Sequence, residues 1–256
     1  MPTVYEIDRF MSEWAPPSLS ESWDNDGIML CGNVSQTVKK VTVCLEINEH
    51  VAKLAAENGS ELIITHHPYI FRPLKSIRGT DYDIASVLIG AGVSVLSYHT
   101  RLDAAEGGVN DALSEKLGLS EVFPFVAESQ PIGRVGKLKT PMKPEEFGNH
   151  IKKSLGVQSM RCAVPDTEKL IKTVALVGGG GKDFVYAASR FADAYVTSDL
   201  SHNAFITANE CGICVFDAGH YHTENPVTEK IAEKHENAFP ELETTVCDSL
   251  CPYVIM

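Results

Sequence analysis

Short runs rich in apolar and β-branched residues alternate along the chain with stretches in which apolar residues recur every three or four positions. The runs predict strands, and the stretches predict helices with one buried face. Because strands and helices alternate, the pattern predicts an α/β fold. Strands are expected at 27–31, 40–47, 61–65, 93–98, 134–139, 160–164, 172–177, 194–197, 213–217 and 243–247. Helices are expected at 4–14, 50–58, 81–91, 109–117, 144–155, 182–191, 201–210 and 226–238.

Two breaks in this pattern predict the domain organisation. Several strands, such as ELIIT at 61–65, contain almost only apolar or small residues, as expected when helices cover both faces of a sheet. The segment AESQP at 127–131 predicts a boundary, and a second break falls near Gly212. We therefore expect two α/β domains, the second (128–212) inserted between two halves of the first (1–127 and 213–256).

The composition narrows the classes of partner. The chain has 256 residues and a formal net charge of -12. A surface of this charge repels nucleic-acid phosphates and anionic lipids, so neither a nucleic acid nor a membrane is an expected partner. The first residues lack a basic segment followed by an apolar one, and no apolar run approaches the ~18 residues that span a bilayer. We expect a cytoplasmic protein.

Seven cysteines are present, and two pairs have short spacings, Cys211 with Cys214 and Cys247 with Cys251. Such pairs can bind a structural zinc ion or form a redox couple. Cys214 lies in a predicted apolar strand, where cysteine behaves as a small buried apolar residue. The favoured interpretation is reduced thiols in packing positions, and a structural zinc ion on both pairs is the alternative.

Histidines follow predicted buried strands at several places. His66, His67 and His99 lie at the ends of two such strands, and His220 follows a third. In α/β sheets, ligands bind beyond the carboxyl ends of the strands, where loops bring together residues that are distant in sequence. These histidines are therefore candidates for a common site.

The first two clusters each have two interpretations. Pro68 favours an extended conformation at His67, and two adjacent imidazoles in a turn suit two metal ions, although they can also cap the strand by hydrogen bonds. Asp103 lies four residues after His99 and can bind one ion or bridge two, or it can be a turn or cap residue. His99 can be a ligand, a residue that orients a ligand, or a general base.

The third cluster contains His220 and Glu224, which are four residues apart. One helical turn places both on one face, which makes half of a zinc, manganese or iron site. Asp217 and His222 lie close in sequence but on different faces. In isolation the segment can also be a helix start with an acidic first turn.

Taken together, three clusters of histidine and carboxylate at three strand ends predict a dinuclear metal site. Nitrogen and oxygen ligands suit two divalent ions, zinc, manganese or iron, which lie ~3.5–4 Å apart in such sites and activate a bridging water. The predicted ligands are His66, His67, Asp103, His220 and Glu224.

Two other motifs are less specific than these clusters. The segment VGGGGKDF has Leu176 and Asp183 where a Walker loop requires glycine and Ser or Thr, but its glycines can still hold an anion on backbone amides. Asp199 and His202 follow another strand and can line the same cleft. The alternative is that Ser198 or Asp199 caps a helix.

Six of these segments occur together and in the same order in a known family. The chain resembles the GTP cyclohydrolase I type 2-like family, also called the NIF-three-like dinuclear metal proteins. This resemblance implies two α/β domains, the second inserted in the first, a hexameric toroid and a metal pair on residues matching the five predicted ligands. The matching segments are WDNDGIMLCG at 23–32, ELIITHHPYIFRPLKSI at 61–77, HTRLDAAEGGVNDALSEKLGL at 99–119, the GGGG turn, TSDLSH at 197–202 and DAGHYHTE at 217–224.

One residue departs from the family pattern. His222 stands where the family usually has a small residue, so it can add a ligand, shuttle a proton or only alter the pocket. The family name implies opening of the guanine ring of GTP, but a resemblance defines a site better than a substrate.

The expected function is a metal-dependent hydrolase of a nucleotide or related small molecule, with His99 and His222 as candidate acid or base. The alternative is a non-enzymatic metal-binding regulatory or chaperone-like protein, whose ring is a platform for partners. A metal-free binding module is a third interpretation.

Overall fold

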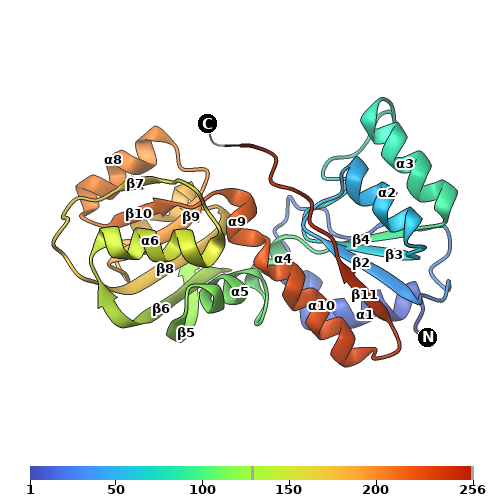
Figure 1. Ribbon diagram of the computed structural model, residues 1–256, viewed down its shortest axis with the longest axis horizontal. Helices are drawn as coiled ribbons and strands as arrows, with labels where there is room; N and C mark the ends of the chain where they lie inside the picture. The colour runs from blue at the N-terminus through green and yellow to red at the C-terminus, as the bar shows by residue number, and fades with distance from the viewer. Residues whose placement is uncertain (128–129, 255–256) are drawn as a thin grey trace. The chain divides into compact units, whose positions relative to one another are not determined.

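The computed structural model describes residues 1–127 and 130–254, which form two compact units (Figure 1). Unit 1 comprises Met1–Glu106 and Val227–Leu250, and unit 2 comprises Gly107–Pro226 and Cys251–Met256. Most of unit 2 is therefore inserted between two segments of unit 1, which confirms the predicted two-domain α/β architecture. The boundaries lie at 106/107 and 226/227, whereas the sequence pattern had placed them at 127/128 and 212/213.

Strand pairing explains this difference. Strand β5 (Leu119–Ala127) pairs with β6 (Gln130–Met142), and β10 (Cys214–Asp217) pairs with β9 (Ala194–Ser198), so residues on both sides of the expected boundaries belong to the sheet of unit 2. Residues 128 and 129 of the expected first boundary lie outside the described residues. As a consequence, His220 and Glu224 belong to unit 2, not to the domain that carries His66.

Unit 1 contains a five-stranded sheet in the order β1-β4-β3-β2-β11. All neighbours are parallel except β1, which pairs antiparallel with β4. Helices α2 (Glu49–Glu57) and α3 (Thr80–Ala91) lie on one face of the sheet, and α1 (Val4–Trp14) and α10 (Pro226–Ala238) on the other (Figure 1). The strands are β1 (Gly27–Leu30), β2 (Lys40–Cys44), β3 (Leu62–Thr65), β4 (Ser94–Ser97) and β11 (Glu243–Val246).

The ends and the packing of α1 follow from its sequence. Thr3 Oγ1 accepts a hydrogen bond from the Glu6 amide, and the Glu6 carboxylate accepts one from the Thr3 amide, so the helix begins with a capping box. Its apolar residues at helical spacing are buried, and the Phe10 ring meets the His235 ring of α10 with centroids 5.7 Å apart.

Unit 2 contains a six-stranded sheet in the order β5-β6-β8-β9-β10-β7, in which β8 (Ile171–Gly180), β9 and β10 are parallel. Leu113 and Phe147 of helices α5 (Val109–Lys116) and α6 (Pro144–Leu155) belong to one apolar cluster of this sheet. Val185 and Ala204 of α7 (Val185–Ala188) and α8 (His202–Cys211) belong to a second. The expected helix at 182–191 is a 3-10 turn, η2 (Lys182–Phe184), followed by α7. The remaining strand is β7 (Arg161–Ala163).

All ten expected strands are present, and β5 is an additional one. Its sequence LSEVFPFVA contains Pro124, which cannot donate to a strand ladder and argues against a central strand. The structure accommodates this proline because β5 is an edge strand of its sheet. Two further short helices, α4 (Thr100–Ala104) and α9 (His220–Glu224), follow β4 and β10, and a 3-10 turn, η1 (Pro17–Leu19), follows α1.

The parallel strands of each sheet end in register. In unit 1, Thr65 at the end of β3 pairs with Cys44 of β2 and with Ser97 of β4. In unit 2, Thr197 of β9 pairs with Asp217 of β10. The loops that follow these strands therefore start along one edge of each sheet, where α/β proteins bind ligands.

Among the described residues, no helix combines the length and apolar character needed to cross a membrane.

Candidate metal centre

Three histidines of unit 1 lie together beyond the carboxyl ends of β3 and β4. One ring nitrogen of each of His66, His67 and His99 lies within 4.8 Å of the corresponding nitrogens of the other two. Their ring centroids are 5.1 to 5.8 Å apart. Imidazole nitrogens at such separations can hold a zinc, manganese or iron ion.

Each of these histidines has its Nδ1 atom hydrogen-bonded to an oxygen of the protein. His66 Nδ1 lies 3.0 Å from the Tyr98 carbonyl oxygen, and His67 Nδ1 lies 3.0 Å from Glu46 Oε2. His99 Nδ1 lies 2.8 Å from a carboxylate oxygen of Asp24. Because these oxygens accept and do not donate, each Nδ1 carries the proton, and the lone pair is on Nε2. Such bonds orient the ring of a metal-binding histidine and raise its basicity.

Asp24 is itself held firmly. Its second carboxylate oxygen accepts hydrogen bonds from the Thr100 amide, at 3.0 Å, and from the Thr100 hydroxyl, at 2.6 Å. Burial raises the pKa of the Asp24 carboxyl, but the hydrogen bonds from His99 and Thr100 outweigh it and hold this pKa well below its usual range. Asp24 therefore remains ionised and fixes the His99 ring.

Asp103 extends the cluster of unit 1 with a carboxylate. It lies on α4, whose first turn starts at His99, and its Oδ1 atom is 3.6 Å from His66 Nε2. The predicted ligands His66 and Asp103 therefore lie close together, and this edge of unit 1 has both nitrogen and oxygen atoms that can bind a metal ion.

Unit 2 brings its two predicted ligands together on α9. His220 Nε2 lies 2.9 Å from Glu224 Oε2, one helical turn away. His220 Nδ1 lies 2.7 Å from Asp199 Oδ2, which repeats in unit 2 the carboxylate–histidine pairing of His99 and His67. Asp199 has φ +55°, a left-handed conformation that aspartate tolerates better than most residues.

Glycines of β8 allow the close approach of α9. A Cβ atom on Gly179 would overlap Glu224 Oε1 and would lie 3.2 Å from His220 Nε2, and the φ of Gly179 is +67°. The Gly179 amide donates to Thr223 Oγ1 at 3.0 Å, and the Gly178 amide donates to Asn110 Oδ1 at 2.8 Å. These amides therefore bind side chains of unit 2, where the sequence had allowed an anion.

A cavity of about 330 Å³ in unit 2 adjoins His220. Asp217, which lines it, accepts hydrogen bonds from Arg161 and from the Leu200 amide. The burial of Tyr253, another lining residue, raises the pKa of its phenol. The complete lining is Ser159, Met160, Arg161, Asp199, Asp217, Gly219, His220 and Tyr253.

Two other candidates, His222 and His202, belong to none of the potential metal-binding groups found among the described residues. His222 is two residues beyond His220 on α9, a spacing that places it on a different side of the helix, and its Nδ1 lies 3.2 Å from the Leu155 carbonyl oxygen. His202 is the first residue of α8 and is exposed. The cap of that helix is Ser201, whose hydroxyl accepts from the Ala204 amide at 3.3 Å, and not Ser198 or Asp199.

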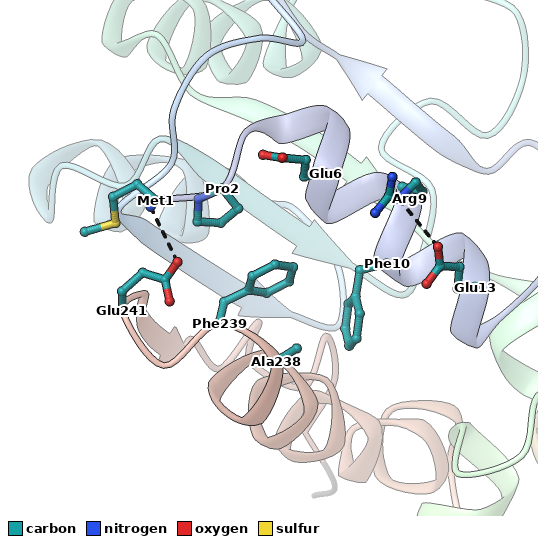
Figure 2. A pocket seen from close by; sticks show the side chains of 9 residues that line it. All are labelled: Met1, Pro2, Glu6, Arg9, Phe10, Glu13, Ala238, Phe239 and Glu241. Carbon is teal, nitrogen blue, oxygen red and sulfur yellow. Dashed lines mark ion pairs between the residues drawn. The ribbon is translucent and has the colours of Figure 1, made fainter.

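Unit 1 also has a larger hollow, of about 410 Å³, between α1 and the end of α10 (Figure 2). Four of its charged groups form ion pairs, Arg9 with Glu13 and the Met1 ammonium with Glu241, each at 3.5 Å, while Glu6 accepts from the Thr3 amide. Phe10 and Phe239 form its apolar part, with ring centroids 5.3 Å apart. None of the predicted ligands lines this hollow.

The donor sets fit divalent metal ions of the zinc, manganese and iron type, because imidazole nitrogens with hydrogen-bonded Nδ1 atoms stand beside carboxylates. No group of three or more potential ligands found among residues 1–127 and 130–254 includes a cysteine. All seven cysteines are free thiols, and burial raises the pKa of Cys214 and Cys247, which disfavours the thiolate that zinc binds.

The fold and these clusters define a class of two-unit α/β proteins that present histidine and carboxylate side chains at the ends of parallel strands. The model of the Duf34/NIF3 (NGG1p interacting factor 3) family matches residues 2–251, and the chain belongs to this family. The resemblance found in the sequence motifs is therefore confirmed.

Several proteins share this sequence and fold. The chain is 36% identical over 239 residues to a "GTP cyclohydrolase 1 type 2 homolog" of Clostridium perfringens, covering 90% of this chain and 89% of the relative. The solved structure of reduced HcgD from Methanocaldococcus jannaschii is 28% identical, with a TM-score of 0.82, over 96% of this chain and 97% of that one. A Bacillus cereus protein related to NIF3 has the same fold, with a TM-score of 0.90 at 20% identity over 100% of this chain and 99% of that one.

Proposed function

We propose that this protein is a metal-dependent hydrolase that holds two divalent ions, zinc, manganese or iron. The observation that carries the proposal is the hydrogen bond made by Nδ1 of the three proposed ligand histidines, His66, His67 and His220, because this arrangement leaves each Nε2 lone pair for a metal ion. The proposed ligands are His66, His67, Asp103, His220 and Glu224.

Each unit contributes to the proposed ligand set. Unit 1 supplies His66, His67 and Asp103, and unit 2 supplies His220 and Glu224. A bound metal pair would supply a water of lowered pKa and would polarise the substrate.

In this mechanism the residues of the chain orient the substrate and move the proton. His99 carries its proton on Nδ1, where Asp24 accepts it, so Nε2 is a base for a proton of the attacking water. The ionised Asp24 then stabilises the imidazolium that forms. His222 is the second candidate for proton transfer, and its Nδ1 is held by the Leu155 carbonyl oxygen.

The proposed substrate is a nucleotide or a related small molecule. Support comes from the names of relatives, several of which are called homologues of GTP cyclohydrolase 1 type 2. We further propose that the protein works in the cytoplasm as a homohexamer, as the family resemblance implies, and that neither a membrane nor a nucleic acid is a partner.

A second candidate function is a non-enzymatic metal-binding regulatory or chaperone-like protein. His66 is fully buried, and an ion held deep in a protein is shielded from exchange with water, which favours a structural or stored metal.

Turnover by metal-loaded protein separates the two candidates. The protein is loaded with manganese, zinc or iron, its metal content is measured, and a panel of nucleotides is incubated with it. The hydrolase proposal predicts two ions per chain and the formation of a hydrolysis product, which the His66→Ala variant should no longer form. Two tightly bound ions without turnover of any nucleotide would support the regulatory or chaperone-like function instead.

A further inference from the structure

Two large aromatic side chains of unit 1 are exposed beside the histidine cluster. Trp23 is 60% exposed and Phe71 is 44% exposed. Their ring centroids lie 6.1 Å apart, and those of Trp23 and Phe71 lie 6.2 and 6.0 Å from the His99 ring. The three rings meet at interplanar angles of 64° to 85°. Exposed aromatic side chains that gather in this way leave apolar ring surface for a ligand.

The loop that carries Trp23 is pinned although the indole is exposed. Asp24 binds His99 and Thr100, and Asp26 Oδ1 forms an ion pair with Arg101 Nη2 at 3.2 Å. Asn25 Nδ2 donates to the Ile70 carbonyl oxygen, which ties this loop to the residue before Phe71. These bonds hold the loop next to Trp23 in place before any ligand binds, so that less backbone entropy remains to be lost.

A basic segment follows Phe71. Arg72, Lys75 and Arg78 are exposed, and none of them forms an ion pair within the described part of the chain. No acidic residue occurs between Phe71 and Asp81. The net charge of the chain is -12, but the segment 72–78 contains three cations and no acidic residue. It is therefore a local site for an anion.

We propose that the base of a nucleotide stacks on Trp23, with Phe71 against the edge of the base, and that the basic segment 72–78 receives its phosphate. This inference rests on the proposed function and names the residues that select its substrate. Aromatic stacking contributes about 1–3 kcal/mol per base and accepts any planar heterocycle, so these residues select for a base without distinguishing guanine from adenine.

A nucleotide fits these observations better than a second copy of the chain. The exposed cations Arg72, Lys75 and Arg78 match the phosphate of a nucleotide. An interface at this place would also cover His99, which the proposed mechanism requires to meet the substrate.

Fluorescence of metal-free protein tests the proposal, because the chain has two tryptophans. The Trp14→Phe variant retains Trp23 alone, and the Trp23→Phe variant retains Trp14 alone as the matched control. Each is titrated with GMP, guanosine and ribose 5-phosphate. We expect saturable quenching by GMP and guanosine in Trp14→Phe, no quenching in Trp23→Phe, and no quenching by ribose 5-phosphate in either.

Further variants assign the two parts of the nucleotide. In the Trp14→Phe background, Phe71→Ala should weaken GMP binding about tenfold, the lower half of the stacking range. The triple change Arg72→Gln, Lys75→Gln and Arg78→Gln should reduce GMP affinity to that of guanosine. Unchanged melting temperatures would show that these exposed substitutions leave the fold intact.

The proposal is overturned if GMP does not quench Trp23, or if its affinity is the same after Phe71→Ala. It is also overturned if Trp23→Ala dissociates an oligomer while GMP affinity stays constant, because the aromatic pair would then belong to an interface. Binding is measured without metal and without turnover. Base binding with no hydrolysis by the loaded protein would therefore refute the proposed hydrolase and leave this inference standing.

Discussion

The Asp199 carboxylate lies 2.7 Å from Nδ1 of His220, and His220 in turn lies 2.9 Å from Glu224 through its other nitrogen. The first of these two contacts recurs in unit 1, where the Asp24 carboxylate binds Nδ1 of His99 and the Glu46 carboxylate binds Nδ1 of His67. Carboxylates that hold the Nδ1 proton fix the tautomer in which Nε2 is the ligand atom. Metal affinity should therefore depend on residues that need not touch an ion.

Replacing Asp199 tests this dependence. Asp199→Asn keeps the size of the side chain but removes the charge that supports His220, so we expect metal affinity to fall 10- to 100-fold. Competition with a chelating dye measures the affinity. Asp183→Asn is the matched control, an exposed aspartate of the same unit, and it should leave affinity unchanged. Equal affinities for both variants would show that Asp199 does not position the ligand.

Gly179 and Gly212 provide a matched pair of substitutions. Both have left-handed φ angles, +67° and +68°, but an added Cβ would meet Glu224 at Gly179 and nothing within 4 Å at Gly212. Gly212→Ala should cost about 1 kcal/mol, the strain of a left-handed alanine. Gly179→Ala should cost more and should also weaken metal binding, because Glu224 must move. Urea unfolding and metal titration measure the two effects, and equal losses for both variants would contradict the close approach of Glu224.

His235 gives unit 1 a pH-dependent stability. Burial lowers the pKa of His235 to about 4, and its Nε2 meets the Met11 sulfur at 3.2 Å. Since an unfolded histidine has a pKa near 6.5, the unfolded chain takes up a proton first as the pH falls. The stability due to the neutral side chain is complete above about pH 6.5 and is lost as the pH falls towards 4. Between pH 7 and pH 5 the loss should be about 2 kcal/mol.

The variant His235→Phe isolates this contribution. It should reduce the difference in unfolding free energy between pH 7 and pH 5, measured by urea denaturation, by the same amount. His50→Gln, which changes an exposed histidine of the same unit, should not alter the difference. A variant His235→Phe with the original pH dependence would place the titrating group elsewhere.

The ion pair of Arg134 and Asp111 should stabilise unit 2. Arg134 is buried, and its guanidinium donates twice to the Asp111 carboxylate, both at 2.7 Å. Arg134→Met removes both bonds and leaves Asp111 partly buried, so we expect a loss of about 3 kcal/mol in unfolding free energy. The control is Lys137→Met, which lies on the same strand as Arg134. It removes an exposed ion pair with Glu121 and should cost less than about 1 kcal/mol of unfolding free energy. Similar costs for both variants would show that burial does not strengthen the Arg134 pair.

The sequence predicted the parts of the fold that depend on local pattern. Strands β3 and β4 are buried throughout and contain only apolar or small residues, so their positions and the histidines that follow them were evident. Strand β5 was missed because Pro124 is acceptable only at a sheet edge, and edge position depends on pairing with distant residues. The domain boundaries were displaced for the same reason, since pairing between β5 and β6 cannot be inferred from either segment alone.

Candidate ligands were easier to predict than the residues that orient them. A histidine at the end of a buried strand is a recognisable signal, whereas Asp24 reaches His99 across 75 residues of sequence and Glu46 reaches His67 across 21. No periodicity connects such pairs. In the sequence, Asp24 is visible only as one acidic residue of the family segment WDND, and nothing there indicates that it binds His99.

The division of the chain also determines the order in which the units can be completed during synthesis. Residues 107–226 of unit 2 are contiguous, whereas the sheet of unit 1 lacks its edge strand β11 until residues 243–246 emerge. The packing of His235 against Met11 likewise joins residues 224 positions apart. A chain whose synthesis stops before α10 therefore has a unit 1 sheet without its β11 edge strand and with α1 alone on one face, and quality control would meet it as an incomplete protein.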